Sequence, residues 1–318
     1  MEAVAEPKTL QEAIVYFADQ DNCLKYLAAK RWPSGKVICP TCGGDSVIFL
    51  AKQKRWKCRV KHTQQQFSVK VGTVMEDSPI GLDKWLMAMW QIVNSKNGIS
   101  SYEVHRAIGV TQKTAWFLDH RIRFALGMEP SPEQLSGEVE VDETFIGGKA
   151  RNMHAKRRRQ VITGTGPKDK VAVMGLLERG GKVRAMVVPS RKKKVLQAEV
   201  KKHVEAGSAI FSDALLSYEG LDKDFAHGVV DHAVAYVDGK IHTNGRENFW
   251  SLLKRGLHGT YVSVEPFHLF RYLDEKCFKF NNRKMTDSDR FRIAVDGIVG
   301  KRLTYATLTG KIEEAVQS

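Results

Sequence analysis

Three cysteines and one histidine are spaced like the ligands of a metal site. Cys39 and Cys42 form a C-x2-C pair, and Cys58 is separated by three residues from His62. Thiolate and imidazole ligands at such spacings favour a closed tetrahedral zinc site. We therefore predict a zinc ribbon over residues 36–72 with one structural Zn²⁺. Zinc binding would contribute to its folding, because so small a segment has little core of its own. Reduced core cysteines beside a surface histidine are the alternative.

The remaining cysteines do not indicate disulfide bonds. The chain has five cysteines, an odd number, and Cys23 and Cys277 lie within apolar helical patterns that suit packing residues. This usage fits a reducing compartment. The N-terminal residues are acidic and lack an apolar signal core, and no apolar run approaches the roughly 20 residues of a membrane span. We expect a cytoplasmic protein with no membrane partner.

The charge of the chain points to a polyanionic partner. Its 50 Lys and Arg residues exceed its 36 Asp and Glu residues, which gives a formal net charge of +14. Such an excess attracts nucleic acid, and the neutralised phosphates supply much of the affinity for DNA or RNA. A ribosome-associated or merely basic protein would carry the same charge. At 318 residues, the chain is long enough for two or three domains.

Two segments have helical periodicity. Residues 1–35 form a helical lead-in, and residues 80–127 contain a helix followed by a helical pair that Gly109 interrupts. A helix, a short glycine-containing turn and a second helix predict a helix-turn-helix-like DNA-binding segment. Its second helix would present Gln112 and Lys113 to bases and phosphates. An ordinary helical hairpin is the alternative.

From residue 137 the pattern changes to strands with interleaved helices. Strand-like runs occur at VEVDETFIGG, VAVMGLLE, VRAMVVP and SAIFSDA, and helices are expected over 193–206, 214–220, 246–255 and 266–281. The ERGGKV stretch between the second and third runs predicts a hairpin, and hence an antiparallel pair. This order favours an α/β core with a mixed sheet over residues 137–285, followed by a C-terminal tail over residues 286–318.

Three acidic residues are candidate ligands of catalytic metal ions. Asp142 lies in the first of these strands, Asp213 ends the fourth, and Glu247 lies on an amphipathic helix. Carboxylates from separate elements can hold two hard cations about 3.5–4 Å apart, which suits phosphoryl transfer. Taken singly, each acid has another explanation: a solvated strand face, a helix cap or a surface position in a first helical turn. If the three converge, a chain of this kind cuts or joins nucleic acid.

The helix that carries Glu247 has two distinct faces. Glu247, Ser251 and Lys254 follow one stripe, and the apolar residues around Phe249 follow the other. Lys254 would therefore be able to bind a phosphate near a metal ion that Glu247 holds. Trp250 and Tyr261 could stack on an unpaired base, although a core position suits Trp250 better.

Two basic stretches lie close to the candidate acids in sequence. They contain Lys149, Arg151, Arg157, Arg158 and Arg159 between the first two strands, and Lys192 and Lys193 before Asp213. Beside a metal site, such residues can hold a DNA backbone without reading its sequence. By itself, a charged run is more often a solvated face or a loop.

Long stretches of the sequence resemble bacterial insertion-sequence transposases of the DDE type. The resemblance is carried by VDETFIGG, FSDALLSY, HTNGRENFWSLLKRGLHGTY and FNNR, with CPTCGG, QQQFSVKVGTVMEDSPIGLDKWL and the final RLTY. These stretches occur in the expected order over roughly residues 20–305. They are similar to the group that has an N-terminal zinc ribbon and an RNase H-like catalytic core.

The resemblance implies a set of site residues: Asp142, Asp213 and Glu247 as ligands of two Mg²⁺ or Mn²⁺ ions, with Lys254 as the accompanying basic residue. Some relatives have asparagine as the third member, so Asn244 or Asn248 is an alternative to Glu247. The second ligand pair of the ribbon departs from C-x2-C, and the assignment of His62 rests on this chain alone.

The resemblance also implies a reaction and its partners. Cleavage at the ends of an insertion sequence would release a 3′-OH, which then attacks a phosphodiester of target DNA. The partners would be double-stranded DNA, at the terminal inverted repeats and the target, and at least one more copy of the chain. A bacterial protein associated with the nucleoid fits this activity. Two other functions stay open: a zinc-ribbon DNA-binding regulator without catalysis, and an RNase H-like nuclease without strand transfer.

Overall fold

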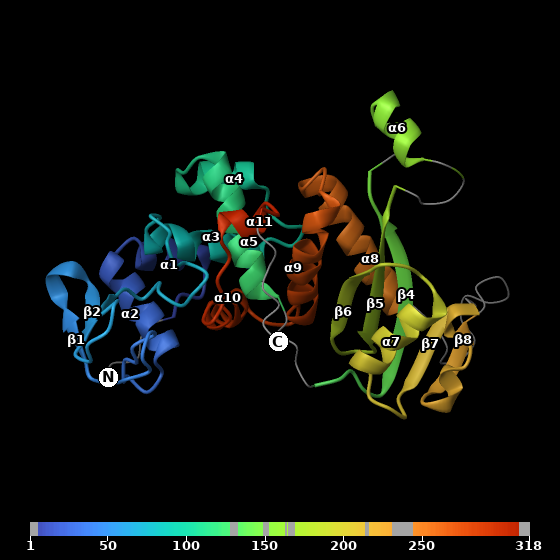
Figure 1. Cartoon of the computed structure of the whole chain (residues 1–318), viewed down its shortest axis with the longest axis horizontal. Coiled ribbons are helices and arrows are strands. Elements are labelled where there is room, and N and C mark those ends of the chain that lie inside the picture. The colour runs from blue at the N-terminus through green and yellow to red at the C-terminus, as the bar shows by residue number, and fades with distance from the viewer. Residues whose placement is uncertain are drawn as a thin grey trace. The chain divides into compact units, whose positions relative to one another are not determined.

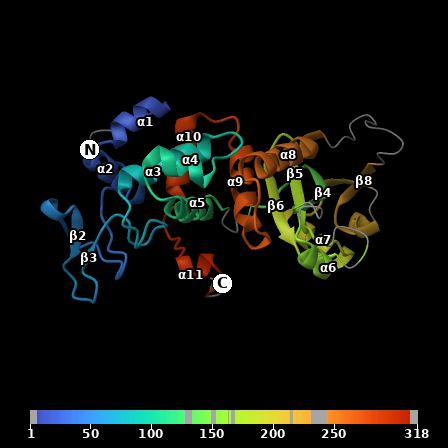
Figure 2. The same ribbon diagram turned by 90° about the horizontal axis from the view of Figure 1, so that it is seen from above.

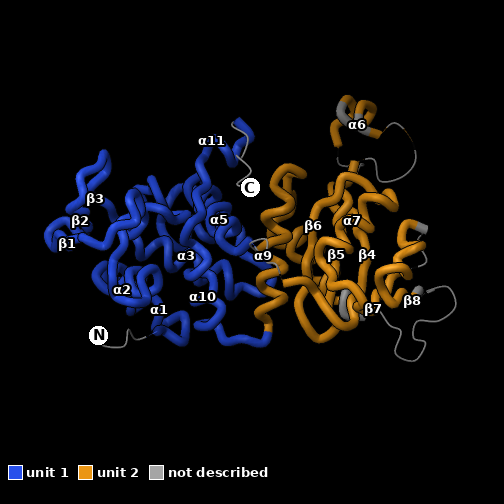
Figure 3. Tube along the Cα trace, turned by 60° about the horizontal axis from the view of Figure 1, so that its bottom comes forward, with its two compact units in different colours: residues 1–127, 284–318 blue, residues 128–283 orange. Residues whose placement is uncertain are grey.

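A computed structural model describes residues 6–127, 133–148, 153–162, 164, 169–213, 216–230 and 244–311 (Figure 1). The chain divides into two compact units, residues 1–127 with 284–318 and residues 128–283, which Figure 3 colours separately. Among the residues described, no helix is long and apolar enough to cross a membrane.

The first unit is built from helices at both ends of the chain. They are α1 (Leu10–Phe17), α2 (Gln20–Arg31), α3 (Leu82–Asn94), α4 (Ser101–Ile108), α5 (Gln112–Leu126), α10 (Asp287–Asp296) and α11 (Tyr305–Leu308). Phe291 of α10 lies 5.9 Å from the ring of Tyr26 and 4.9 Å from that of Trp90. The segment described above as a C-terminal tail therefore contributes a helix to the core of this unit.

The cysteine-bearing segment forms a small antiparallel sheet. Its strands are β1 (Val47–Leu50), β2 (Arg55–Cys58) and β3 (Gln66–Phe67), with the 3-10 turn η1 (Ala51–Gln53) between the first two. Trp56 on β2 is 7% exposed, and its ring lies 5.1 Å from Trp32 and 6.2 Å from Phe67. These three aromatic rings are the core of the ribbon.

Helices α4 and α5 are joined at Gly109, the position where the sequence predicted a break between two helices. Ser100 and Glu103 make a capping box at the start of α4, in which each side chain accepts from the other's backbone N–H. Gly109 ends α4 with a φ of 62°, a left-handed conformation that favours glycine. The hydroxyl of Thr111 then accepts from the N–H of Thr114 and caps α5.

The second unit contains a five-stranded mixed sheet. Its strands are β4 (Glu138–Ile146), β5 (Val171–Glu178), β6 (Val183–Val188), β7 (Ala209–Asp213) and β8 (Ala226–Val230), in the order β6-β5-β4-β7-β8. The pairs β4–β5 and β5–β6 are antiparallel, whereas β4–β7 and β7–β8 are parallel. The predicted mixed sheet and the hairpin are confirmed, and β8 is a strand that the sequence did not predict.

Helices cover both faces of this sheet (Figures 1 and 2). Helix α7 (Lys193–His203) packs on the face that carries Val139 and Val141, with Leu196 in the same core cluster. Helices α8 (Asn244–Arg255) and α9 (Leu269–Asn281) pack on the other face, against Val173 and Leu177. Successive residues of a strand point to opposite faces, so Asp142 lies on the face that α8 covers.

Some local elements differ from the sequence predictions. The region expected to be helical over 214–220 contains the 3-10 turn η3 (Leu216–Tyr218), and η4 (Leu221–Lys223) follows it. Helix α9 begins after another turn, η6 (Pro266–His268), and α8 continues into the π-helical η5 (Gly256–Thr260). A short helix, α6 (Ala155–Val161), stands between β4 and β5.

Candidate functional site

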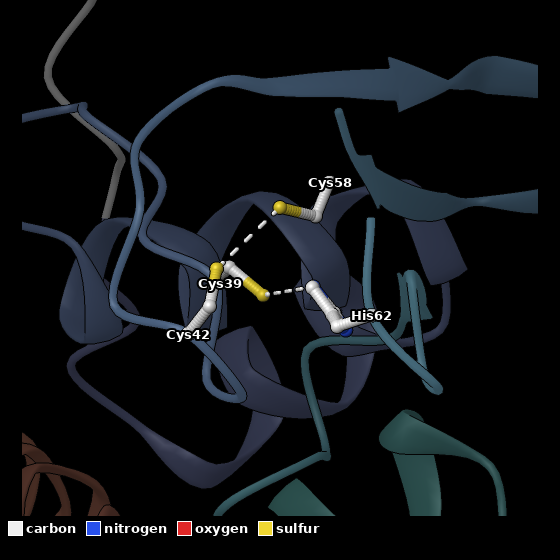
Figure 4. A group of neighbouring side chains, drawn as sticks. All are labelled: Cys39, Cys42, Cys58 and His62. Atoms are coloured by element: carbon white, nitrogen blue, oxygen red, sulfur yellow. Dashed lines mark hydrogen bonds between the residues drawn. The ribbon is translucent and has the colours of Figure 1, made fainter. Parts of the chain in front are cut away.

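The four predicted zinc ligands come together in the ribbon (Figure 4). The ligand atoms of Cys39, Cys42, Cys58 and His62 all lie within 4.8 Å of one another. The Sγ atoms of Cys42 and Cys58 are 3.7 Å apart, and Cys39 Sγ is 3.4 Å from His62 Nε2. Three sulfurs and one imidazole nitrogen at these separations fit a tetrahedral structural zinc site.

The local electrostatics also suit a metal ligand. Burial disfavours the charged form of Cys39, but the N–H groups of Cys42 and Thr41 and the nearby thiols outweigh it and lower the pKa to about 7. Thiolate is the form that binds zinc. By contrast, burial raises the pKa of Cys23 and of Cys277 to about 12. Both are fully packed within helices, as predicted, and remain neutral thiols.

Asp142 is held in place by two hydrogen bonds. Its Oδ1 accepts from the backbone N–H of Glu143 at 2.8 Å, and its Oδ2 accepts from the indole Nε1 of Trp250 at 3.0 Å. The carboxylate is half-buried, so it does not lie on an open solvated strand face. Carboxylate oxygens are the ligands that Mg²⁺ and Mn²⁺ prefer.

The backbone brings Asp213 next to Asp142. In the parallel pair β4–β7, Glu138 faces Ala209 and Glu140 faces Phe211. The paired residues end at Glu140 and Phe211, and continuing the same register by two residues would set the backbone of Asp213, the last residue of β7, opposite Asp142. The side chain of Asp213 lies outside the described part of the structure, so the register is the observation that relates the two.

Helix α8 lies across this part of the sheet. Trp250 is 6% exposed, which confirms its core position, and it belongs to the same core cluster as Phe249 and Leu253. Lys254 is exposed, as the predicted polar stripe requires. The backbone of Glu247 is in α8, one turn before Trp250, and its side chain is among those not described.

The asparagine alternatives are only partly visible. Asn248 is exposed on α8, whereas the side chain of Asn244 lies outside the described residues. The ligand that α8 supplies is therefore still a prediction.

Some of the basic candidates can be placed. Arg158 and Arg159 are exposed on α6, and Lys192 and Lys193 are exposed at the start of α7. In the same basic run, the guanidinium of Arg191 stacks on Phe145 of β4, 4.7 Å from the ring centroid. The start of α7 therefore lies beside the end of the strand that carries Asp142. Lys149, Arg151 and the side chain of Arg157 lie outside the described residues.

The first turns of α5 have specific neighbours. Gln112 donates from Nε2 to the hydroxyl of Ser101 at 2.9 Å, and Lys113 is exposed with its ammonium 5.2 Å from the ring of Tyr305. Lys113 and Phe117 line a pocket of about 250 Å³ with Tyr305. Gln112 thus braces the helix pair, and Lys113 is the more available of the two for a phosphate.

Sequence reasoning missed an ion pair beside the acidic site. Glu140 points to the same face as Asp142, is 1% exposed, and accepts from Arg179 Nε at 2.9 Å. Arg179 also binds Glu138 at 2.8 Å and lies 4.1 Å from the ring centroid of Phe211. The pair ties β4 to the end of β5. The sequence places Glu140 two residues before Asp142, and hence on the same face of the strand, but it does not show that Arg179 pairs with it.

Two domain models match this chain. The ISXO2-like transposase domain matches residues 134–281, and the transposase zinc-ribbon domain matches residues 18–60. The first spans the mixed sheet with α7, α8 and α9, and the second includes the three cysteines of the metal group. Residues 134–281 are thus an ISXO2-like transposase domain, and a transposase zinc-ribbon domain precedes it.

One relative matches most of this chain. It is an uncharacterised protein in the transposable element ISH50 of Halobacterium salinarum, 28% identical over 255 residues. The match covers 76% of this chain and 84% of the relative. The resemblance stated from the sequence and the predicted combination of zinc ribbon and α/β catalytic domain are thus confirmed. His62 lies just past the matched ribbon; it was predicted from its spacing to Cys58, and its imidazole lies with the three thiols.

Proposed function

We propose that this transposase cleaves the ends of an insertion sequence and joins them to target DNA by two-metal phosphoryl transfer. The observation that supports it most is the parallel register of β4 and β7, together with α8 docked at Asp142. In this arrangement, Asp213 and Glu247 would lie at the same region of the sheet as Asp142. When bound, two Mg²⁺ or Mn²⁺ ions would supply activation of the attacking oxygen and stabilisation of the leaving one.

The residues of the chain have separate tasks in this proposal. Asp142 and Asp213 offer carboxylate oxygens from adjacent strands, and Glu247 offers a third from α8. Lys254 lies two turns further along α8 and is exposed, so it can hold a phosphate of the DNA end. The mixed sheet fixes the two aspartates, because adjacent hydrogen-bonded strands cannot slide without breaking their ladder.

Basic residues outside the metal site would hold the DNA backbone. Arg158 and Arg159 on α6, and Lys192 and Lys193 at the start of α7, are exposed and lie in the same unit as Asp142. Their contribution would be independent of sequence and sensitive to salt. Recognition of the terminal inverted repeats would fall to the zinc ribbon and to α5, with Lys113 on a phosphate. Two ends must be brought together, so we expect at least a homodimer on DNA.

Purified full-length protein with Mg²⁺ and DNA carrying the ends of its own insertion sequence provides the test. The wild type should produce nicked ends and then a joined product, whereas Asp142→Asn and Asp213→Asn should produce neither while still binding the ends. The matched control is Asp222→Asn, in η4 of the same unit. A joined product formed by Asp213→Asn at the wild-type rate would refute the proposal.

The same assay separates the alternative functions. A nuclease without strand transfer would cleave the ends but never form the joined product. A regulator would bind the ends without cleaving them, and Asp142→Ala would leave its binding and regulation unchanged.

A comparison of three variants identifies the third ligand. If Glu247 supplies it, Glu247→Gln should abolish cleavage, and Asn244→Ala and Asn248→Ala should retain it. Loss of cleavage in only one of the asparagine variants would assign the ligand to that residue instead.

A further inference from the structure

We propose that Trp250 is a positioning residue for the metal-binding carboxylate of Asp142. Its indole N–H would fix the orientation of that carboxylate, and its ring would fix the position of α8 over the sheet. This inference rests on the proposed function, because it concerns the same metal site. Three features of the structure support it: the hydrogen bond, the burial of the ring, and a glycine that makes room for the ring.

The hydrogen bonds leave the carboxylate little freedom to turn. The torsion that rotates an aspartate carboxylate is broad and has no sharp rotamer preference. In this protein, Oδ2 accepts from Trp250 Nε1 at 3.0 Å while Oδ1 accepts from the N–H of Glu143 at 2.8 Å. Because each oxygen accepts from a donor that is itself held in place, rotation breaks at least one of these bonds. The direction in which the carboxylate faces a metal ion is then fixed, as a metal ligand requires.

The indole of Trp250 can reach Asp142 only because the residue that pairs with Asp142 on β5 is a glycine. Gly175 of β5 pairs directly with Asp142 of β4. A Cβ atom at Gly175 would stand 2.5 Å from Cζ2 and 2.7 Å from Cη2 of Trp250, which is closer than real contacts allow. Glycine weakens a strand interior and often marks a place where another group approaches closely. In this strand the approaching group is the Trp250 ring.

The same contact sets the position of the helix. Trp250 is 6% exposed, and it packs with Phe249 and Leu253 against the sheet. Glu247 precedes Trp250 by one turn of α8, about 4.5 Å along the axis at 1.5 Å per residue. Because Trp250 is fixed against both β4 and β5, the backbone of Glu247 cannot shift along the sheet without displacing the indole. One side chain thus orients the first carboxylate and locates the element that carries the third.

The decisive measurement is the Mn²⁺ affinity of the zinc-loaded, full-length protein. Isothermal calorimetry and the electron paramagnetic resonance signal of free Mn²⁺ both measure this affinity. Trp250→Phe keeps a buried aromatic ring and removes the donor. We expect it to weaken Mn²⁺ binding by roughly 10- to 100-fold, the range found when a hydrogen-bond partner of a metal ligand is removed. The matched control is Trp85→Phe, which removes an indole donor from Ser78 Oγ in the other unit. It should leave Mn²⁺ affinity unchanged.

A second pair of variants separates metal binding from folding. Gly175→Ala forces a methyl group into the Trp250 ring, so it should lower both the melting temperature and Mn²⁺ affinity. In Gly175→Ala/Trp250→Phe, the smaller ring leaves room for the methyl group. The double variant should regain much of the melting temperature lost in Gly175→Ala but none of the Mn²⁺ affinity. Recovery of affinity together with stability would show that Trp250 acts only by packing, and would overturn the inference.

Asp142→Asn distinguishes a failure of this inference from a failure of the proposed function. If Asp142→Asn abolishes Mn²⁺ binding and Trp250→Phe binds as tightly as the wild type, the metal site stands and the role of Trp250 is refuted. If Asp142→Asn binds Mn²⁺ as the wild type does, the metal site itself is wrong.

Discussion

Loss of one zinc ligand should weaken zinc binding, so that a competing chelator unfolds the ribbon and leaves the catalytic unit folded. A zinc ion about 2.3 Å from each sulfur and about 2.0–2.1 Å from a nitrogen, at tetrahedral angles, separates two sulfurs by about 3.8 Å and a sulfur from a nitrogen by about 3.6 Å. The corresponding separations are 3.7 Å between Cys42 and Cys58 and 3.4 Å between Cys39 and His62. Two of the six separations between ligand atoms therefore match those around a bound ion, and all six are within 4.8 Å.

The expected loss of zinc affinity can be estimated from the free energy of zinc binding. Structural zinc sites contribute about 10–16 kcal/mol of binding free energy at neutral pH. If the four ligands share it evenly, His62→Ala loses roughly 3 kcal/mol, or about two orders of magnitude in zinc affinity. His62→Cys supplies another zinc ligand and should retain most of the affinity. The three rings around Trp56 make too small a core to keep the segment folded without the ion.

Zinc content and trypsin cleavage provide the assay. The loop and strand between Lys52 and Lys61 contain several lysines and arginines, which are cut when the ribbon opens. A competing chelator should strip His62→Ala at concentrations that leave the wild type loaded, and rapid cleavage within this segment should follow. His154→Ala, an exposed histidine of the other unit, serves as the control. If the zinc-free wild type resisted trypsin as the loaded protein does, the coupling of zinc to folding would be refuted.

Three further predictions concern the catalytic unit. Glu140→Gln removes the buried charge that pairs with Arg179, and it should lower the free energy of unfolding by roughly 3 kcal/mol. The exposed Glu138→Gln should cost under about 1 kcal/mol, and urea titrations measure both values. The double variant Arg158→Ala/Arg159→Ala should reduce the steepness of the plot of log DNA affinity against log salt concentration by up to about 2. Fluorescence anisotropy measures this slope, and an unchanged slope would show that α6 does not contact the DNA. Burial lowers the pKa of His227, so the unfolded chain binds its proton more readily. The free energy of unfolding should therefore fall as the pH drops below about 6.5, and His227→Gln should flatten part of that dependence in melts between pH 7 and pH 5.

Local patterns predicted those elements whose chemistry is contained in a few neighbouring residues. The C-x2-C pair, the glycine break between α4 and α5, and the glycine turn between β5 and β6 each fix their own geometry. Strand β8 was missed because AHGVV contains a glycine and a histidine and lacks a clear alternation. It is a strand because β7 offers it a parallel edge to pair with. Helix α10 was missed because its apolar side is completed by residues near the other end of the chain.

The candidate site shows the same limit at the level of single side chains. Asp142 could be chosen from its strand and its motif, but the sequence left Trp250 as a packing residue or a stacking platform. Its hydrogen bond joins residues 108 positions apart, and it exists only because Gly175 leaves a gap on a third element. None of these three residues predicts the contact by itself. The contact forms only when β5, α8 and β4 pack together and bring the glycine, the tryptophan and the aspartate side by side. The orientation of the Asp142 carboxylate therefore depends on the packed core.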